Sequence, residues 1–528
     1  MRRISIRVCL ANITIWKSFS IITFKKGFFV IYGMTYIQKA VSGASWIFLM
    51  SMFASLIAYI TRIVLARHLG PSDFGLFYAV FTFVIFFLFF RDLGFLQALM
   101  KYIAEFKVHN EFGKIKSAIM TTFYFQFASS ILFGVVFYFL APYLAIHYFK
   151  NPEAGTILRV LIFYIFGSVF FIISKDTLMG FQRTALFSLG EFLKNGLVFL
   201  MILLFFYFDK GIYAPVYAFA IVCFLLFLFY LFFLLRAFPL FKTRSTEFKL
   251  VSRKMIFFAI PVFATAVGGK IIGYIDTLML TYFRSLEEVG IYNVILPTSL
   301  LFLFFGTAAA SIILPMVSEL WAKNDKVRIV EGMRLVYRYL FVVLLPVVAI
   351  LFVFASFFLN LFFGKEYVVG TAALQVLLVG VFLYALSVIN HSFFTAIGKP
   401  QVVTMIIFIS AAVNVGSNLL LIPLFGITGA AVSTSVCYAV AFVISVWKAK
   451  SYLGIEVPWK KWGRLLFAGS VFVLLLYQIP VWLHLNLWVE IILSVLISSI
   501  VYLLLIFYLK VIDVDEIKRY VRLVRWKG

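Results

Sequence analysis

Two stretches of this sequence match each other, "IAYITRIVLARHLGPSDFGLF" at residues 57–77 and "IGYIDTLMLTYFRSLEEVGIY" at residues 272–292. At a constant offset and without a gap, the aligned pairs include Tyr59 with Tyr274, Gly75 with Gly290 and, much farther along, Gly211 with Gly426. Because the register is kept over such a distance, the matches indicate an internal duplication.

Apolar residues dominate the chain around the duplicated stretches. Of its 528 residues, 64% are hydrophobic and only 13% are charged, which is more apolar surface than a soluble core can bury. An all-α integral membrane protein is therefore predicted. Runs long enough to cross a bilayer can be placed fourteen times, at residues 45–66, 74–100, 117–145, 156–174, 184–207, 211–235, 255–283, 289–318, 339–363, 370–397, 401–422, 427–447, 465–483 and 487–509.

The duplication relates spans 1–6 to spans 7–12 and leaves the last two spans appended. Since six spans return the chain to the side where it began, we expect two lobes related by a pseudo-two-fold axis along the membrane normal. Transporters of this design bind substrate between their lobes and rock around it. The predicted regions are an N-terminal segment at 1–43, an N-lobe at 44–236, a basic cytoplasmic loop at 237–254, a C-lobe at 255–450, helices 13 and 14 at 451–510 and a tail at 511–528.

Lys and Arg are distributed unevenly between the two sides of the membrane. With the N-terminus in the cytoplasm, 36 of the 46 basic residues fall in inner segments, five in outer loops and five inside or at the edges of spans. This asymmetry is a positive-inside signal and predicts a multi-pass protein of the cell membrane with both termini in the cytoplasm. It also explains the net charge of +25 without nucleic acid, which we do not expect as a partner.

Both ends of the chain are basic. A basic, weakly periodic extension precedes Met34, where the sequence reads like an ordinary start, so either Met34 is the initiator or the extension is an interfacial segment. At the other end, residues 513–528 place Ile517, Val521 and Val524 at helical spacing among Lys and Arg. This pattern predicts an amphipathic cytoplasmic helix that lies on anionic lipid.

Spans 1 and 7 carry charges beside stripes of small residues. Arg62 ends the stripe Ser51, Ser55 and Ala58, and Lys270 lies next to the stripe Gly269, Gly273 and Asp276. Such faces suit a cavity between the lobes, since charged side chains inside a membrane usually serve a function. The alternatives are close helix packing for the small residues and interhelical ion pairing for Arg62 and Lys270. The repeat places Asp276 opposite Thr61, so Arg62 and Asp276 are candidates for an outer gate.

Other polar residues inside spans are weaker candidates. Arg91 and Asp92 lie in the inner part of span 2 and suggest an inner gate, in which Arg91 reaches the mouth of the cavity and Asp92 pairs with another helix. Glu191 and Lys194 are neighbours on one helix face and either pair locally or line the cavity. The remaining candidates are Asn414 and Asn418 for substrate hydroxyls or helix packing, and His391 for proton relay or as a satisfied buried histidine.

Three stretches are informative: "TRIVLARHLGPSDFGLF" (61–77), "FRDLGFLQALMKYIAE" (90–105) and "FFTAIGKPQVVTMIIFISAAVNVGSNLLLIPLFGITGAAVSTSV" (393–436). Together they resemble the polysaccharide and oligosaccharide flippases (the O-antigen type) of the multidrug/oligosaccharidyl-lipid/polysaccharide exporter superfamily. The resemblance implies transfer of an undecaprenyl- or dolichyl-linked oligosaccharide from the inner to the outer leaflet, for the assembly of cell-surface glycans. Lipid II flippases and multidrug extruders are relatives of this family.

We therefore predict a flippase that works by alternating access, with a lipid-linked oligosaccharide as substrate, membrane lipids as surroundings and H⁺ or Na⁺ as coupling ion. Glycan-assembly enzymes are expected as partners, and no enzyme activity, catalytic residue, cofactor or metal is expected, since flipping breaks no bond. The alternatives are a multidrug or cation extruder, for which an acidic cavity is expected, and a membrane glycosyltransferase or polymerase, for which a large outer loop is expected.

Overall fold

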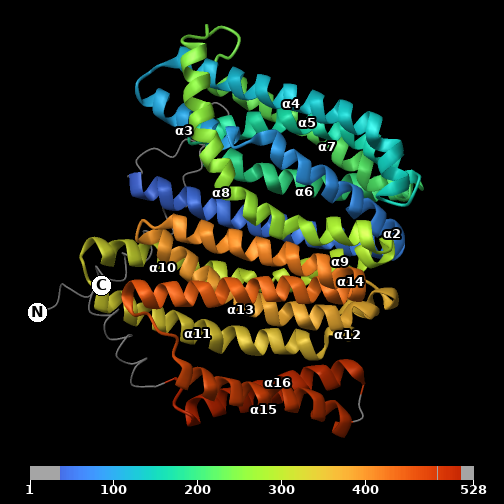
Figure 1. Cartoon of the computed structure of the whole chain (residues 1–528), viewed down its shortest axis with the longest axis vertical. Coiled ribbons are helices and arrows are strands. Elements are labelled where there is room, and N and C mark those ends of the chain that lie inside the picture. The colour runs from blue at the N-terminus through green and yellow to red at the C-terminus, as the bar shows by residue number, and fades with distance from the viewer. Residues whose placement is uncertain (1–35, 484–485, 513–528) are drawn as a thin grey trace, which may run out of the picture.

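The computed structural model describes residues 36–483 and 486–512, and all regular secondary structure in these ranges is helical (Figure 1). This confirms the predicted all-α membrane fold. The residues before Met34 and the amphipathic helix predicted at 513–528 lie outside the described residues.

Figure 1 arranges the chain in three groups of helices, with the N-lobe at the top, the C-lobe in the middle and the last two helices below. The N-lobe contains α2 (Tyr36–Asp92), α3 (Phe95–Val108), α4 (Phe112–His147), α5 (Glu153–Gly180), α6 (Thr184–Tyr207) and α7 (Tyr213–Ala237). The C-lobe contains α8 (Phe248–Phe283), α9 (Leu286–Leu300), α10 (Leu303–Ala322), α11 (Lys326–Val353), α12 (Ala355–Phe362), the 3₁₀ helix η1 (Lys365–Gly370), α13 (Thr371–Ala396) and α14 (Pro400–Leu453).

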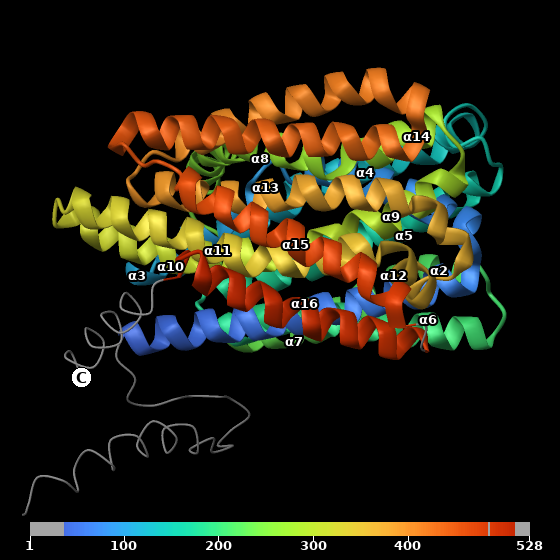
Figure 2. The same cartoon turned by 90° about the horizontal axis from the view of Figure 1, so that it is seen from below.

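The final hairpin consists of α15 (Trp459–Leu483) and α16 (Leu487–Tyr508). Figure 2 shows this hairpin in front of the C-lobe. The hydroxyl of Tyr502 on α16 donates a buried hydrogen bond of 3.0 Å to the carbonyl oxygen of Val342 on α11. The hairpin is therefore attached to the C-lobe through α11.

Two of the helices turn back on themselves at glycine. Twelve helical segments of the described chain are long and apolar enough to cross a membrane. Two of these contain a sharp kink, at Gly70 with φ 71° and at Gly426 with φ 56°, values that glycine adopts without a steric penalty. Counting each limb of α2 and α14 separately gives the fourteen crossings that the sequence predicts.

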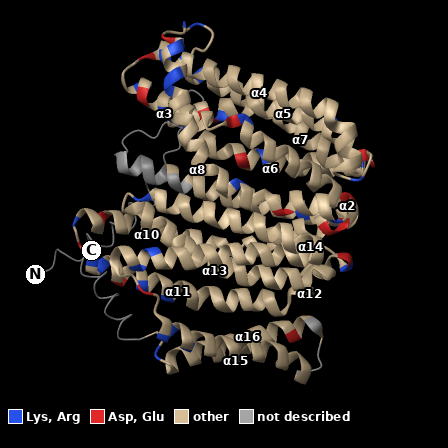
Figure 3. Cartoon of the chain, in the orientation of Figure 1, with Lys and Arg blue, Asp and Glu red and all other residues tan. Residues whose placement is uncertain are grey.

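The two ends of the bundle differ in charge. Figure 3 shows most Lys and Arg at the end where α3 lies. We call this the basic end; it carries the connections at residues 109–111, 238–247, 323–325 and 454–458. The opposite end, which we call the kink end, carries Gly70, Gly426 and the connections at residues 148–152 and 208–212.

The region around the basic end departs from the predicted spans in two places. The span predicted at 74–100 is broken at Leu93 and Gly94, both of which have positive φ, and α3 is a separate helix. In addition, α8 begins at Phe248, inside the stretch predicted as a loop. The first turns of α8 pack on α3 and α4 of the N-lobe, whereas its last turns pack in the C-lobe on α14, so α8 joins the two lobes.

Candidate functional site

The two lobes meet at the kink end through a pair of glycines. A side chain at Gly75 on α2 would overlap the carbonyl oxygen of Leu286 on α9, and one at Gly290 on α9 would overlap the carbonyl oxygen of Pro71 on α2. In the alignment of the two repeats, Gly75 corresponds to Gly290 and Pro71 to Leu286. The contact is therefore reciprocal, as a two-fold axis requires, and small residues allow the backbones to approach this closely.

Arg62 lies on the limb of α2 that precedes the kink and contacts both lobes. Its guanidinium carbon is 4.6 Å from the centre of the Tyr78 ring, and its Nη1 donates a hydrogen bond to the carbonyl oxygen of Asn293. Tyr78 and Asn293 are again equivalent positions of the two repeats, at the same constant offset. Arg62 thus joins the N-lobe to the C-lobe without a carboxylate partner in the described part of the chain.

Further hydrogen bonds join the lobes toward the kink end. Arg67 Nε donates to the carbonyl oxygen of Phe362 at 2.8 Å, and Tyr367 Oη donates to that of Ala66 at 3.1 Å. Because these contacts add to the glycine pair, the lobes are closed on each other at this end.

An apolar groove runs beside the limb of α2 that contains Arg62. Its cavity volume is about 1110 Å³, and α2 contributes Ser51, Ser55, Tyr59 and Ile63 to its lining. The C-lobe contributes residues of α9 to α13, all of them apolar except Thr298. The small stripe of span 1 thus faces the C-lobe across an apolar groove.

Lys270 lies next to the corresponding stripe of α8. A side chain at Gly269 or Gly273 would have no neighbour within 4 Å, so this face of α8 borders open space. The Lys270 ammonium is 5.8 Å from the centre of the Phe89 ring and 5.6 Å from that of Tyr274. Within the described residues Lys270 makes no salt bridge, so its charge is compensated only by ring faces.

Asp276 is buried inside the C-lobe and accepts hydrogen bonds from four side chains. Tyr292 Oη is 2.5 Å from its Oδ2, Asn418 Nδ2 is 2.6 Å and Asn414 Nδ2 is 3.3 Å from its Oδ1, and Thr434 Oγ1 also donates to Oδ2. These donors come from α9 and from both limbs of α14. All four are uncharged, and the amide oxygens of Asn414 and Asn418 are buried without a hydrogen-bond partner in the described part of the chain.

The structure does not bring Arg62 and Asp276 together as the outer gate that the repeat suggested. Asp276 is 2% exposed and surrounded by its C-lobe donors, whereas Arg62 is directed at Asn293 and Tyr78. The repeat alignment relates positions of the two helices, but it does not determine the side-chain partners, which differ for Arg62 and Asp276.

Arg91 does not reach the mouth of a cavity either. It is 2% exposed and donates 2.9 Å hydrogen bonds from Nη1 to the carbonyl oxygen of Ile165 and to Ser168 Oγ, both on α5. Asp92 accepts from Gln126 Nε2 on α4 at 2.8 Å and from the backbone nitrogen of Leu96 at 3.1 Å. The pair therefore holds the broken end of α2 inside the N-lobe.

Glu191 and Lys194 form a salt bridge of 2.6 Å on one face of α6. Glu191 also accepts from Lys175 on α5 at 2.8 Å, and Lys175 lies 3.9 Å from Asp176. The charge of Lys194 is thus shared within a network in the N-lobe. Arg62, Arg91 and Lys270 form no salt bridge among the described residues. Since Arg91 is buried against α5, Arg62 and Lys270 are the predicted cations that remain available for an anionic ligand.

His391 lies half-buried on α13 in the C-lobe. Its Nε2 is 3.2 Å from Ser387 Oγ, one turn earlier on the same helix, and its ring is edge-on to Tyr384. The structure brings none of Asp276, Asn414 or Asn418 into hydrogen-bond contact with His391, so the two polar groups of the C-lobe are separate.

Sequence reasoning missed several members of these networks. Lys175 and Asp176 were assigned to the inner loop because the predicted span 156–174 ends just before them, although α5 continues to Gly180. Gln126 stands alone in an apolar run, Tyr292 precedes Asn293, and Thr434 lies between Ser433 and Ser435, but none of the three belongs to a periodic polar stripe that the sequence analysis singled out. A search for every polar side chain inside a predicted span would have found these three residues, but not their partners.

Comparison with known proteins gives two family matches. A family model described as Polysaccharide biosynthesis protein matches residues 40–321, and the MatE model matches residues 261–420. The chain is 30% identical over 504 residues to the uncharacterized membrane protein MJ1068 of Methanocaldococcus jannaschii, covering 92% of this chain and 98% of that protein. It is 23% identical over 260 residues to the probable low-salt glycan biosynthesis flippase Agl15 of Haloferax volcanii, covering 49% of this chain and 55% of that protein.

The fold is similar to that of a solved structure, the lipid II flippase MurJ in an inward closed conformation. The TM-score is 0.73 at 16% sequence identity, and the match covers 88% of this chain and 99% of the other. At this identity the likeness concerns the helical architecture, which it confirms.

Proposed function

The chain belongs to the polysaccharide biosynthesis protein family, within the superfamily of flippases and multidrug exporters that the sequence resembles, and on this basis we propose that it flips a lipid-linked oligosaccharide across the membrane. The proposed substrate is a polyprenyl-diphosphate-linked or similar glycan, and the proposed direction is from the inner to the outer leaflet.

One observation carries this proposal, namely that Arg62 lies directly beside the apolar groove. Two residues near Arg62 on α2 line the groove: Tyr59, about one turn earlier, and Ile63, the next residue. A lipid-linked glycan has an anionic diphosphate head and a long apolar tail. A guanidinium is well suited to bind phosphate oxygens, and a groove of about 1110 Å³ with an apolar lining suits part of the tail.

Lys270 supports the same proposal from the other lobe. It borders open space on α8 and lacks an anionic partner in the described chain, so it is available for a phosphate. A cationic drug would instead favour an acidic pathway, and the carboxylates of Asp92, Asp276 and Glu191 are all engaged by other side chains.

The contacts between the lobes support alternating access as the proposed mechanism. The lobes are closed at the kink end by Gly75 and Gly290, which supports assignment of this conformation to a form closed toward the outer leaflet. We place the basic end in the cytoplasm because Lys and Arg gather there. Transport then requires the glycine contact to open.

We further propose that Asp276 couples transport to Na⁺ or H⁺. A buried carboxylate surrounded by neutral donors is costly when charged, and either a bound cation or a proton removes that cost. Rotation of the amides of Asn414 and Asn418 would turn their unpartnered oxygens toward a cation at Asp276. Na⁺ would be held by these oxygens together with Thr434 Oγ1, whereas H⁺ would bind the carboxylate alone.

A leaflet-accessibility assay tests the proposed function. The purified chain is reconstituted in liposomes containing a fluorescent lipid-linked oligosaccharide on one leaflet, and exposure of the glycan on the other leaflet is followed with a membrane-impermeant glycosidase. We expect transfer by the wild type and none by protein-free liposomes. Transfer of a fluorescent cationic drug without transfer of the glycan lipid would favour a multidrug exporter instead.

A further inference from the structure

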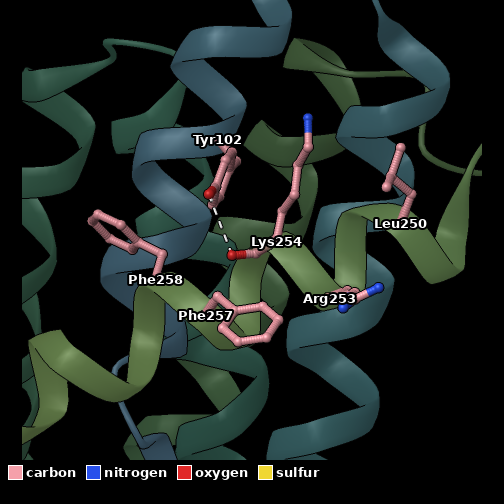
Figure 4. A pocket seen from close by; sticks show the side chains of 6 residues that line it. All are labelled: Tyr102, Leu250, Arg253, Lys254, Phe257 and Phe258. Carbon is pink, nitrogen blue, oxygen red and sulfur yellow. Dashed lines mark hydrogen bonds between the residues drawn. The ribbon is translucent and has the colours of Figure 1, made fainter.

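A second pocket lies at the basic end, on the surface where α3 and α8 meet (Figure 4). Its cavity volume is about 520 Å³, and six residues line it: Tyr102, Leu250, Arg253, Lys254, Phe257 and Phe258. It shares no lining residue with the groove beside Arg62. We propose that this pocket binds the phosphate head of an anionic phospholipid from the leaflet at the basic end, as a resident lipid that is not transported.

Charge is the first argument. Arg253 and Lys254 are exposed neighbours on α8, and none of the six lining side chains is acidic. On α3, the ammonium of Lys101 lies 4.1 Å from the centre of the Phe258 ring and 4.7 Å from that of Tyr102, at the edge of the same pocket. In Figure 4 the Arg253 and Lys254 side chains extend from the rim of the pocket in different directions, and Lys101 adds a third positive charge beside them. Together these charges attract an anionic phosphate to the pocket.

The apolar rim is the second argument, because free phosphate has no use for it. Phe257 is 67% exposed, and Leu250 and Ile256 on the same part of α8 are exposed as well. Lys249, Arg253 and Lys254 alternate with these side chains along the helix. A helix that exposes both basic and large apolar residues is typical of segments lying at a membrane interface, with the apolar groups among the acyl chains.

The pocket is also built on a fixed support. Tyr102 Oη donates a 3.3 Å hydrogen bond to the backbone carbonyl of Lys254, drawn as a dashed line in Figure 4. Beneath the exposed face, Val251, Met255 and Ala259 are buried against α3 and α4. The α8 backbone is thus held by the N-lobe, while the Arg253 and Lys254 side chains remain free to contact lipid.

Size and position favour a phospholipid over the glycan lipid. The pocket is formed by α3 and α8 alone, and a volume of about 520 Å³ holds a small head group but not an oligosaccharide. A lipid bound here contacts α8, the helix that packs on both lobes. This proposal is independent of what the groove beside Arg62 transports.

Binding of a fluorescent-tailed phosphatidylglycerol to the full-length chain in neutral detergent tests the proposal, with phosphatidylcholine of identical tails as comparison. The variant R253Q/K254Q loses two charges, and the control K326Q/K399Q loses two exposed charges at the same end on the C-lobe. We expect about 30-fold weaker phosphatidylglycerol binding for R253Q/K254Q, based on the attraction of each basic residue to anionic lipid, and less than about 3-fold weakening for the control.

Competition identifies the source of the phosphate. Unlabelled phosphatidylglycerol should displace the probe, whereas millimolar inorganic phosphate should not, since it lacks the tails that contact Phe257. The proposal is overturned if both double variants weaken binding equally, or if phosphatidylcholine binds as tightly as phosphatidylglycerol. It is also overturned if inorganic phosphate or the lipid-linked oligosaccharide displaces the probe as effectively as unlabelled phosphatidylglycerol does. A variant that loses phosphatidylglycerol binding but still flips glycan lipid leaves the proposed function intact. If the wild type binds phosphatidylglycerol but does not flip glycan lipid, the proposed function fails and this inference stands.

Discussion

Gly75 and Gly290 each pack against the backbone of the other's helix, so that the two repeats of the chain touch through equivalent residues. The relation that appears in the sequence as a constant offset is therefore a physical contact in the fold. Because no side chain fits at either position, this contact sets how closely α2 and α9 approach and closes the kink end.

Replacing Gly75 with alanine should disturb this closure. The new methyl group would overlap the carbonyl oxygen of Leu286 and force the lobes apart at the kink end. We expect Gly75→Ala to lower transport about 5- to 150-fold in the leaflet assay, since overpacking costs roughly 1–3 kcal/mol. Gly196→Ala on α6 is the matched control, because its added methyl has no neighbour within 4 Å. Equal transport by the two variants would show that the close approach is unimportant.

Lys270→Ala should abolish transport and leave the fold intact. The Lys270 ammonium contacts only the rings of Phe89 and Tyr274 in the described chain, and such cation–π contacts contribute about 0.5–1 kcal/mol. Thermal unfolding in detergent should therefore change little, and Lys270→Arg should keep part of the transport. Loss of folded protein with Lys270→Ala would instead assign Lys270 to helix packing.

Asp276→Asn should uncouple transport from its driving ion. The substitution keeps the shape of the side chain but removes the charge that would hold Na⁺ or H⁺ inside the C-lobe. Proteoliposomes with an imposed Na⁺ gradient or an imposed pH gradient show which ion accelerates the wild type, and we expect no acceleration of Asp276→Asn by either one. His391→Gln serves as the comparison, since His391 lies outside this hydrogen-bond group, and it should respond as the wild type does. A response of Asp276→Asn to the gradient would rule out Asp276 as the coupling site.

Glu191→Gln should lower stability more than Lys194→Gln does. Removal of the Glu191 charge breaks two salt bridges, the one to Lys175 at 2.8 Å and the one to Lys194 at 2.6 Å. The Lys175 side chain is only 9% exposed. Since Glu191 itself is 42% exposed, we expect a loss of about 1–3 kcal/mol, between the values for surface and buried pairs. Lys194→Gln preserves the Lys175–Glu191 pair and should cost less. The midpoint of thermal unfolding measures both, and equal midpoints would contradict a central role for Glu191.

The sequence was sufficient for the number of crossings and for the repeat, because both depend on long-range patterns of apolar residues and glycines, but it did not predict the break at Leu93 and Gly94 or the start of α8 at Phe248. It was insufficient where the role of a side chain depends on hydrogen-bond partners from another helix. Arg91 looked like a gate from its helix alone, but Ser168 and the carbonyl of Ile165 on α5 take up its hydrogen bonds. Likewise, nothing in the run around Asp276 indicated that Tyr292 and Thr434, 16 and 158 residues away, would surround its carboxylate.

Arg62 and the adjacent groove are proposed to bind a phosphate-bearing glycan lipid, and the decisive comparison is between wild type and Arg62→Ala in the leaflet assay. We expect the wild type to expose the lipid-linked oligosaccharide on the opposite leaflet, and Arg62→Ala, folded and reconstituted to the same level, to leave it where it was added. Equal transfer by both proteins, or transfer of a cationic drug in place of the glycan lipid, would refute this role of Arg62.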